Sequence, residues 1–314
     1  MREKNAARMK AQDKYSTSQL FNFARDSYFE RTSRPIYAVI FLLPFIIFYE
    51  LGTIFISTDL LGHYWQGRVV AFVWLQKSLE YAGFGSKLAW VAAPLAVIVI
   101  LMALQLASRK RWSFWPGDIW PMAVESVLLA VPLIVLSLLI NSQDRPQRNA
   151  DQFADSSIRI QIEAVPRCSS VENDGLSPVT EEGGGSSPAI RLLADVVTSI
   201  GAGIYEELVF RLILICVLMV LFQNVFRLNH TNSVILSVLV SAALFSAHHH
   251  IDFFSGQLYQ RALFNWPEFG FRTIVGVYFA FLFAIRGFGI TAGTHAFYDI
   301  IATVINAVFF GSEN

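Results

Sequence analysis

The chain has 314 residues, of which 54% are hydrophobic and 15% are charged, and its formal net charge is zero. Soluble globular proteins have roughly 45–50% apolar and about 25% charged residues, so this composition excludes an ordinary soluble domain. It predicts an all-α fold, a multi-pass transmembrane helical bundle. The balanced charge gives no indication of a nucleic-acid partner. Cys168 and Cys216 lie in a polar and an apolar segment, which argues against a disulfide framework or a cysteine metal site.

Residues 1–35 are polar and basic, and they contain no apolar core followed by a signal-peptidase site. We therefore expect an uncleaved protein whose basic N-terminal segment stays in the cytoplasm and sets the topology. A partner-binding arm is the alternative interpretation of this segment.

Hydropathy predicts about seven spans and one further helix. The spans are expected at 36–57, 88–107, 120–140, 190–226, 233–250, 269–285 and 290–310. Segment 68–81 is shorter and amphipathic, which indicates an interfacial or re-entrant helix. The fourth span would be about 55 Å long as a helix, more than the ~30 Å hydrocarbon core. We therefore expect it to tilt, project or break, with Gly201-Ala202-Gly203 as the hinge.

The long polar segment 142–188 has no helical periodicity and contains Gly183-Gly184-Gly185, so we expect a flexible extramembranous loop. It separates a three-span part (36–141) from a C-terminal membrane core (189–314). The basic clusters fall on one side of the spans, which predicts a cytoplasmic N-terminus and an external C-terminus.

Three charged residues, Glu206, Glu207 and Arg211, lie near the middle of the fourth span. A charge at the centre of a membrane helix costs about 2.5–3.5 kcal/mol on insertion scales, so each needs a partner or a task. Glu207 and Arg211 are one turn apart and can form an ion pair. Glu206 points about 100° away around the helix, and is the carboxylate left to face a cavity as a general base. The alternative is a purely structural cluster.

Two later spans also carry motif residues at one-turn spacing, and each of these pairs contains a histidine. Phe245 and His249 are so related in the fifth span, and His295 and Asp299 in the seventh. A His–Asp pair can fix the tautomer of the imidazole. The run His248-His249-His250 raises the question of a metal, but neighbouring residues on a helix point in different directions, which makes joint ligation poor. The simplest interpretation is one polar cavity shared by three helices.

These three motifs, Glu206-Glu207-x-x-x-Arg211, Phe245-x-x-x-His249 and His295-x-x-x-Asp299, resemble in order those of the CPBP family of intramembrane proteases. That family includes the Rce1-type CAAX prenyl endopeptidases and the bacteriocin-processing or abortive-infection proteins. The resemblance covers roughly residues 190–310.

The resemblance implies a glutamate-dependent endopeptidase that cleaves a membrane-associated polypeptide without a metal or other cofactor. Glu206 would activate a water, assisted by His249, while His295 and Asp299 would stabilise the oxyanion. Glu207, Arg211 and Phe245 would be supporting residues. The expected partners are the substrate polypeptide and the bilayer, and the expected location is a bacterial cytoplasmic membrane.

The chain departs from the family pattern at two positions. Leu212 stands where many members have glycine, and Asp299 stands where asparagine is frequent. An ionised aspartate accepts but does not donate hydrogen bonds, so here Asp299 would either orient His295 or be protonated, rather than contact the oxyanion directly. Which of the three adjacent histidines faces Glu206 stays open. The rival functions are a non-proteolytic scaffold or immunity protein and a proton-coupled transporter.

Overall fold

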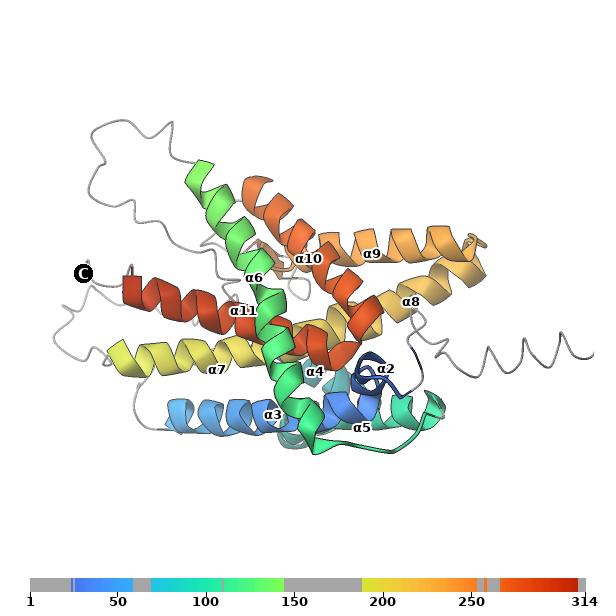
Figure 1. The fold of residues 1–314 in the computed structure, drawn as a ribbon, viewed down its shortest axis with the longest axis horizontal. Coiled ribbons are helices and arrows are strands. Elements are labelled where there is room, and N and C mark those ends of the chain that lie inside the picture. The colour runs from blue at the N-terminus through green and yellow to red at the C-terminus, as the bar shows by residue number, and fades with distance from the viewer. Residues whose placement is uncertain are drawn as a thin grey trace, which may run out of the picture.

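The computed structural model describes residues 24, 26–58, 69–108, 110–143, 188–252, 257–258 and 266–309. Within these ranges the chain forms a helical bundle, and seven helices are long and apolar enough to cross a membrane (Figure 1). The predicted all-α, multi-pass membrane architecture is therefore confirmed.

The N-terminal part contains three of these long helices. Its elements are α2 (Tyr28–Thr32), α3 (Pro35–Thr58), α4 (Val70–Tyr81), α5 (Ser86–Ser108), the short 3-10 turn η1 (Pro116–Asp118) and α6 (Ile119–Gln143). Helix α4 corresponds to the amphipathic segment predicted at 68–81, and at 12 residues it is too short to span a bilayer. Most of the loop predicted at 142–188, namely residues 144–187, lies outside the described residues. Residues 1–23 also lie outside them.

The C-terminal part contains the other four. Its elements are α7 (Pro188–Glu207), the π-helical segment η4 (Leu208–Leu214), α8 (Ile215–Val220), the π-helical segment η5 (Leu221–Val225), α9 (His230–Ala247), α10 (Trp266–Arg286) and α11 (Phe288–Phe309). Strands β1 (Ile251–Asp252) and β2 (Gln257–Leu258) form a short antiparallel pair after α9.

The predicted hinge at Gly201-Ala202-Gly203 is wrong. Helix α7 continues through these residues to Glu207, and the change of backbone geometry is the π-helical segment that follows. The glycines instead permit close packing. A Cβ atom on Gly203 would lie 2.5 Å from the backbone nitrogen of Ala296, and one on Gly201 would lie 2.2 Å from the ring of Tyr49.

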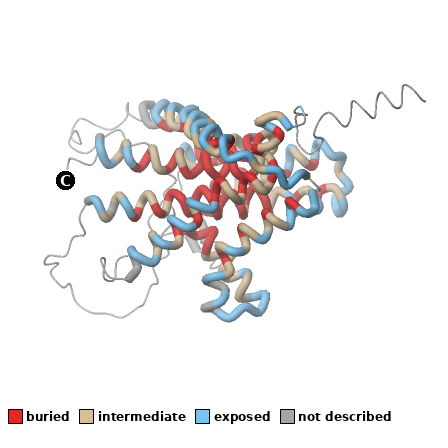
Figure 2. Tube along the Cα trace, turned by 60° about the horizontal axis from the view of Figure 1, so that its bottom comes forward, coloured by how far each residue is buried: buried red, intermediate tan, exposed pale blue. Residues whose placement is uncertain are grey.

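Helix α11 is the centre of the bundle. It packs most extensively against α7 and then against α6, which crosses it in Figure 1. Over its apolar window 72% of the residues are buried, against 22–39% in the other candidate spans. Polar residues on α11 are therefore held inside protein and away from lipid. Figure 2 shows the buried residues gathered in this middle part of the bundle.

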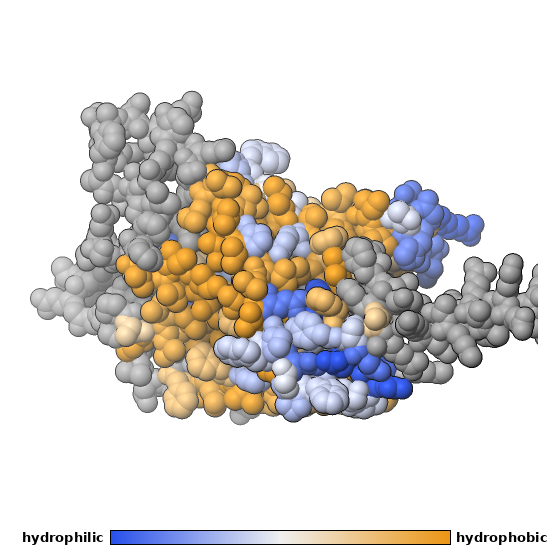
Figure 3. All heavy atoms as spheres, viewed as in Figure 1, coloured by the Kyte–Doolittle hydropathy of each residue, from blue (hydrophilic) through white to orange (hydrophobic). Residues whose placement is uncertain are grey.

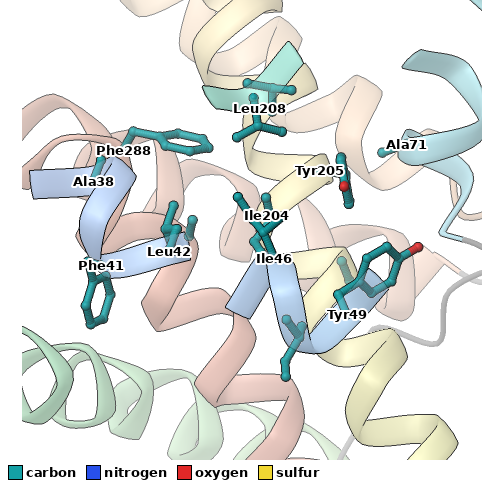
Figure 4. Close-up of a cluster of buried hydrophobic side chains, with 14 of the residues drawn as sticks. Ala38, Phe41, Leu42, Ile46, Tyr49, Ala71, Ile204, Tyr205, Leu208 and Phe288 are labelled. Atoms are coloured by element: carbon teal, nitrogen blue, oxygen red, sulfur yellow. The ribbon is translucent and has the colours of Figure 1, made fainter. Parts of the chain in front are cut away.

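Apolar packing fixes the end of α7 that carries the paired glutamates. Figure 4 shows Ile204, Tyr205 and Leu208 in one apolar cluster with side chains of α3, α4 and α11, and all three are fully buried. Tyr205 also contacts Phe72 of α4 at a ring-centroid distance of 5.0 Å, edge to face. Its hydroxyl donates to the carboxylate of Glu50 on α3 at 3.1 Å. The residue before Glu206 is thus fixed by two N-terminal helices.

The outer surface is suited to lipid. Apolar residues cover most of the face in Figure 3, while hydrophilic residues gather at the side where α2 lies. Large apolar side chains are exposed on several of the long helices, including Leu95, Leu128, Val217 and Phe281. In water such a surface would be an extensive apolar patch, whereas in a bilayer it contacts the acyl chains.

A polar network joins the N-terminal segment to the C-terminal part. The guanidinium of Arg286, at the end of α10, donates to Glu125 of α6 at 2.8 Å, to the carbonyl oxygen of Phe29 at 3.0 Å and to the hydroxyl of Thr32 at 2.9 Å. Tyr28 donates to the same Glu125 carboxylate at 2.7 Å. The described end of the basic segment is therefore bound to the bundle.

Candidate active site

Glu207 connects three elements. One carboxylate oxygen, Oε2, lies 3.1 Å from Nε of Arg211 in η4, and the other, Oε1, lies 2.8 Å from Nδ1 of His295 in α11. All three side chains are buried. The predicted Glu207–Arg211 ion pair is present, and His295 adds a contact that one-turn spacing did not predict.

Arg211 lies between aromatic rings. Its guanidinium carbon is 4.1 Å from the ring centroid of Phe245 and 5.4 Å from that of Phe279. Nη2 also donates to the carbonyl oxygen of Gly276 at 3.5 Å. Cation–π contacts strengthen when the cation is desolvated, so the rings offset part of the cost of burying this charge. Phe245 thus packs directly on the arginine of this ion pair.

Glu206 has a different environment from its neighbour. It is completely buried, and neither of its carboxylate oxygens accepts a hydrogen bond from the described residues. Oε1 lies 3.6 Å from Nε2 of His248, and Oε2 lies 4.0 Å from Nε2 of His295. Two imidazoles from different parts of the fold therefore approach one carboxylate without closing hydrogen bonds to it.

The three adjacent histidines lie in a turn, because α9 ends at Ala247. The prediction that the fifth span continues to residue 250 is wrong, and so is the inference that adjacent histidines must point apart. The rings of His248 and His249 are 3.9 Å apart between centroids. His248 contacts Glu206 most closely, which the sequence left open. Burial, with smaller contributions from His248 and Arg272, lowers the pKa of His249 well below its ordinary value.

His295 is held by carboxylates on both sides of its ring. Nδ1 bonds to Glu207 as described, and Nε2 lies 3.5 Å from Asp299, one turn later on α11. The ring stacks on Phe279 at 4.6 Å between centroids, with an angle of 18° between the planes. Because two carboxylates and an aromatic face surround it, the imidazole has one well-defined orientation.

A metal ion could be held beside this histidine turn. One donor atom from each of Glu206, His248 and His249 lies within 4.8 Å of the others. Ligands about 2.1 Å from a tetrahedral zinc ion are roughly 3.4 Å from one another. These side chains would therefore have to close in to bind such an ion.

Two site residues were not anticipated from the sequence. Phe210 contacts the ring of His248 at 4.8 Å, and Trp74 of α4 contacts it at 5.7 Å. Phe210 lies between Glu207 and Arg211 in the sequence, so its place within the motif indicates a residue near the site. Trp74 lies more than a hundred residues before Glu206, in an amphipathic helix, and no pattern in the sequence linked it to the site.

Residues 188–301 match the family model described as type II CAAX prenyl endopeptidase Rce1-like. Over these residues the chain is similar to that family. The match contains every residue of the three motifs and excludes α2 to α6, so it confirms the family resemblance for the part of the chain that holds the glutamates. It indicates a hydrolase of the CAAX-protease type embedded in the membrane. Searches of curated proteins and of solved structures gave no match.

Proposed function

We propose that the protein is a glutamate-dependent intramembrane endopeptidase in which Glu206 is the general base. The observation that supports this most strongly is the contrast between two adjacent carboxylates. Glu207 forms an ion pair with Arg211 and a hydrogen bond with His295, whereas Glu206 has no hydrogen bond from the described residues and faces two imidazoles. A buried carboxylate with neighbouring proton carriers is suited to accept a proton from water.

The catalytic water would lie between Glu206 and His248. A water about 2.8 Å from both Oε1 of Glu206 and Nε2 of His248 would form the third corner of a triangle with these atoms, which are 3.6 Å apart. Glu206 would take one proton from this water as its oxygen attacks the scissile carbonyl carbon. The proton would then pass to the leaving amine as the tetrahedral intermediate collapses. His249, whose ring lies against that of His248, would support this transfer.

His295 would stabilise the oxyanion. Nδ1 faces the acceptor-only carboxylate of Glu207, and Nε2 lies within 4.0 Å of both Glu206 and Asp299. A protonated His295, held between Glu207 and Asp299, would donate from Nε2 to the developing oxyanion. Asp299 would then act by orienting and neutralising His295, because an ionised carboxylate cannot donate to an oxyanion.

The proposed substrate is a membrane-associated or lipid-anchored polypeptide cleaved near its end. Two observations support this class: the site is buried within a bundle that has an apolar outer surface, and the matched family model is named for endopeptidases acting on prenylated CAAX proteins. A bacterial cytoplasmic membrane with the N-terminus inside is the proposed setting, and reporter fusions to both termini would test that orientation.

A metal-dependent endopeptidase is the second candidate. The convergence of Glu206, His248 and His249 favours it, since three protein ligands and a water are the usual set of a catalytic zinc site. In that case Glu206 would be a ligand and could not also be the base. The glutamate-dependent reaction is preferred because the donor atoms are spread more widely than a bound ion requires.

The two experiments that test the proposal use Glu206→Gln. Comparing the termini of membrane proteins in cells that carry the wild-type protein and in cells that carry Glu206→Gln would reveal the natural substrates. A farnesylated C-terminal peptide in proteoliposomes would test the substrate class directly. We expect cleaved termini to disappear in the variant at equal protein level. Unchanged termini together with unchanged peptide cleavage would refute the proposal.

A further inference from the structure

The orientation of His248 depends on surrounding rings. Helix α9 has ended one residue earlier, so regular helical geometry does not fix this side chain. Its imidazole contacts Phe210 at 4.8 Å, Phe245 at 5.4 Å, His249 at 3.9 Å and Trp74 at 5.7 Å between ring centroids. These contacts determine where Nε2 points.

One hydrogen bond selects the tautomer. Nδ1 of His248 contacts the backbone carbonyl oxygen of Phe245, which can only accept, so Nδ1 carries a proton. In the neutral ring the lone pair is then on Nε2, the atom that faces Glu206. Rotation of the ring by half a turn about the Cβ–Cγ bond would put Cδ2 at the Phe245 carbonyl and Cε1 opposite Glu206, so both contacts and the arrangement around the catalytic water would be lost.

Trp74 differs from the other rings in two ways. It belongs to α4, outside the matched residues 188–301, whereas the others lie within them. It is also half-buried, whereas Phe210, Phe245 and His249 are buried. Among the described rings that contact His248, Trp74 is thus the one nearest the outside of the protein.

Helix α4 holds Trp74 in a fixed place. Its first turn is buried, and Phe72 packs edge to face on Tyr205, the residue before Glu206. Trp74 additionally contacts Phe210 at 5.9 Å. One short helix therefore contacts both the glutamate-bearing end of α7 and the histidine turn, and it fixes the distance between them.

We propose that Trp74 is a positioning residue for His248. Its ring limits rotation of the imidazole, so that Nδ1 stays on the Phe245 carbonyl and Nε2 stays directed at Glu206. For turnover the inference rests on the proposed function, but the orientation of His248 can be measured without any substrate. It also means that the N-terminal part of the chain contributes to the site.

The first test is nuclear magnetic resonance of the protein labelled with ¹⁵N-histidine in detergent micelles, with the His248 signals assigned from His248→Gln. The wild type is expected to show a single tautomer with the proton on Nδ1. Trp74→Ala should show a mixture of both tautomers, and Trp74→Phe should restore the wild-type pattern. Tyr81→Ala, at the exposed end of the same helix, is the matched control and should change nothing. A wild-type tautomer in folded Trp74→Ala would overturn the inference.

The second test measures cleavage of the farnesylated peptide. For Trp74→Ala we expect kcat to fall about tenfold or more with KM changed less than twofold, since small displacements of a catalytic group cost large factors in rate. Trp74→Phe should recover most of kcat. If Trp74→Ala changes KM alone, Trp74 contacts the substrate and does not position His248, which would overturn the inference. If Trp74→Ala does not fold, Trp74→Leu, which fills more of the space than alanine but lacks a ring, replaces it in both tests.

The two proposals fail in distinguishable ways. If Glu206→Gln cleaves normally, the proposed function is wrong, but the tautomer measurement still decides the role of Trp74. If Glu206→Gln is inactive and Trp74→Ala keeps both the wild-type tautomer and the wild-type kcat, the proposed function stands and the role of Trp74 is refuted.

Discussion

Nδ1 of His295 lies 2.8 Å from Oε1 of Glu207, although 88 positions separate the two residues in the chain. The other oxygen of Glu207 forms an ion pair with Arg211. One buried carboxylate therefore neutralises a buried arginine and orients an imidazole of the proposed site. In the proposed reaction the neighbouring Glu206 is the general base, so the two glutamates should respond differently to the same substitution.

Glu207→Gln should destabilise the protein strongly. The substitution removes the negative charge beside fully buried Arg211, and breaking a buried ion pair costs about 3–5 kcal/mol. Glu206→Gln is the matched control, because it makes the same change one residue earlier at a buried carboxylate that accepts no hydrogen bond from the described residues. Thermal unfolding in detergent micelles measures both. Equal losses would show that the two glutamates have the same structural role.

Gly203→Ala should loosen the contact between α7 and α11. The new Cβ would lie 2.5 Å from the backbone nitrogen of Ala296, so the two helices must separate. Overpacking of this kind costs about 1–3 kcal/mol, and the displaced α11 should lower activity through His295. Gly270→Ala is the control, since nothing lies within 4 Å of its new Cβ. If both variants unfold at the same temperature, the close helix contact does not support the fold.

Arg286→Gln should release the N-terminal segment from the bundle. It removes the charged partner of Glu125 and weakens the bonds to Phe29 and Thr32, and we expect a loss of about 3 kcal/mol or more. Limited proteolysis should then cut near α2 faster than in the wild type. Arg111→Gln breaks an exposed ion pair with Asp26 and should cost less than about 1 kcal/mol. If Arg286→Gln is cut as slowly as the wild type, this account of the network is wrong.

Chelators distinguish the two candidate reactions. If Glu206 is the general base, prolonged treatment of the solubilised protein with EDTA or 1,10-phenanthroline should leave cleavage of the farnesylated peptide unchanged. If Glu206, His248 and His249 hold a catalytic ion, activity should be lost and should return when zinc is added. Elemental analysis of the purified wild type and of His249→Ala provides an independent measure of bound metal.

Much of the fold could be predicted from hydropathy, because long apolar segments can bury their backbone polar groups in lipid only as helices. The short helix at 70–81 and the ion pair of Glu207 with Arg211 also followed from local spacing. The end of α9 at Ala247 could not be predicted from the sequence, because apolar composition continues to Phe245 and the histidines interrupt no periodicity. The π-helical segment after Glu207 likewise leaves no clear signal in composition.

The site was predictable in its motif residues and not in its long-range contacts. Spacing within one helix placed Asp299 near His295, but only the packing of α11 on α7 places Glu207 against the same ring. In the sequence the glycine pair at 201 and 203 favours a hinge, because glycine weakens helices, whereas in the folded bundle it permits close contact with Tyr49 and Ala296. Trp74 joins the site through tertiary packing alone.

The most direct test of Glu206 as the base is the rate of peptide cleavage by purified Glu206→Gln in proteoliposomes, measured beside its unfolding temperature. We expect cleavage to fall at least a hundredfold while the unfolding temperature stays at or above that of the wild type, because general-base catalysis contributes about 10²–10⁴-fold. Wild-type cleavage by the folded variant would contradict the central claim. A loss of cleavage accompanied by unfolding would instead assign Glu206 a structural role.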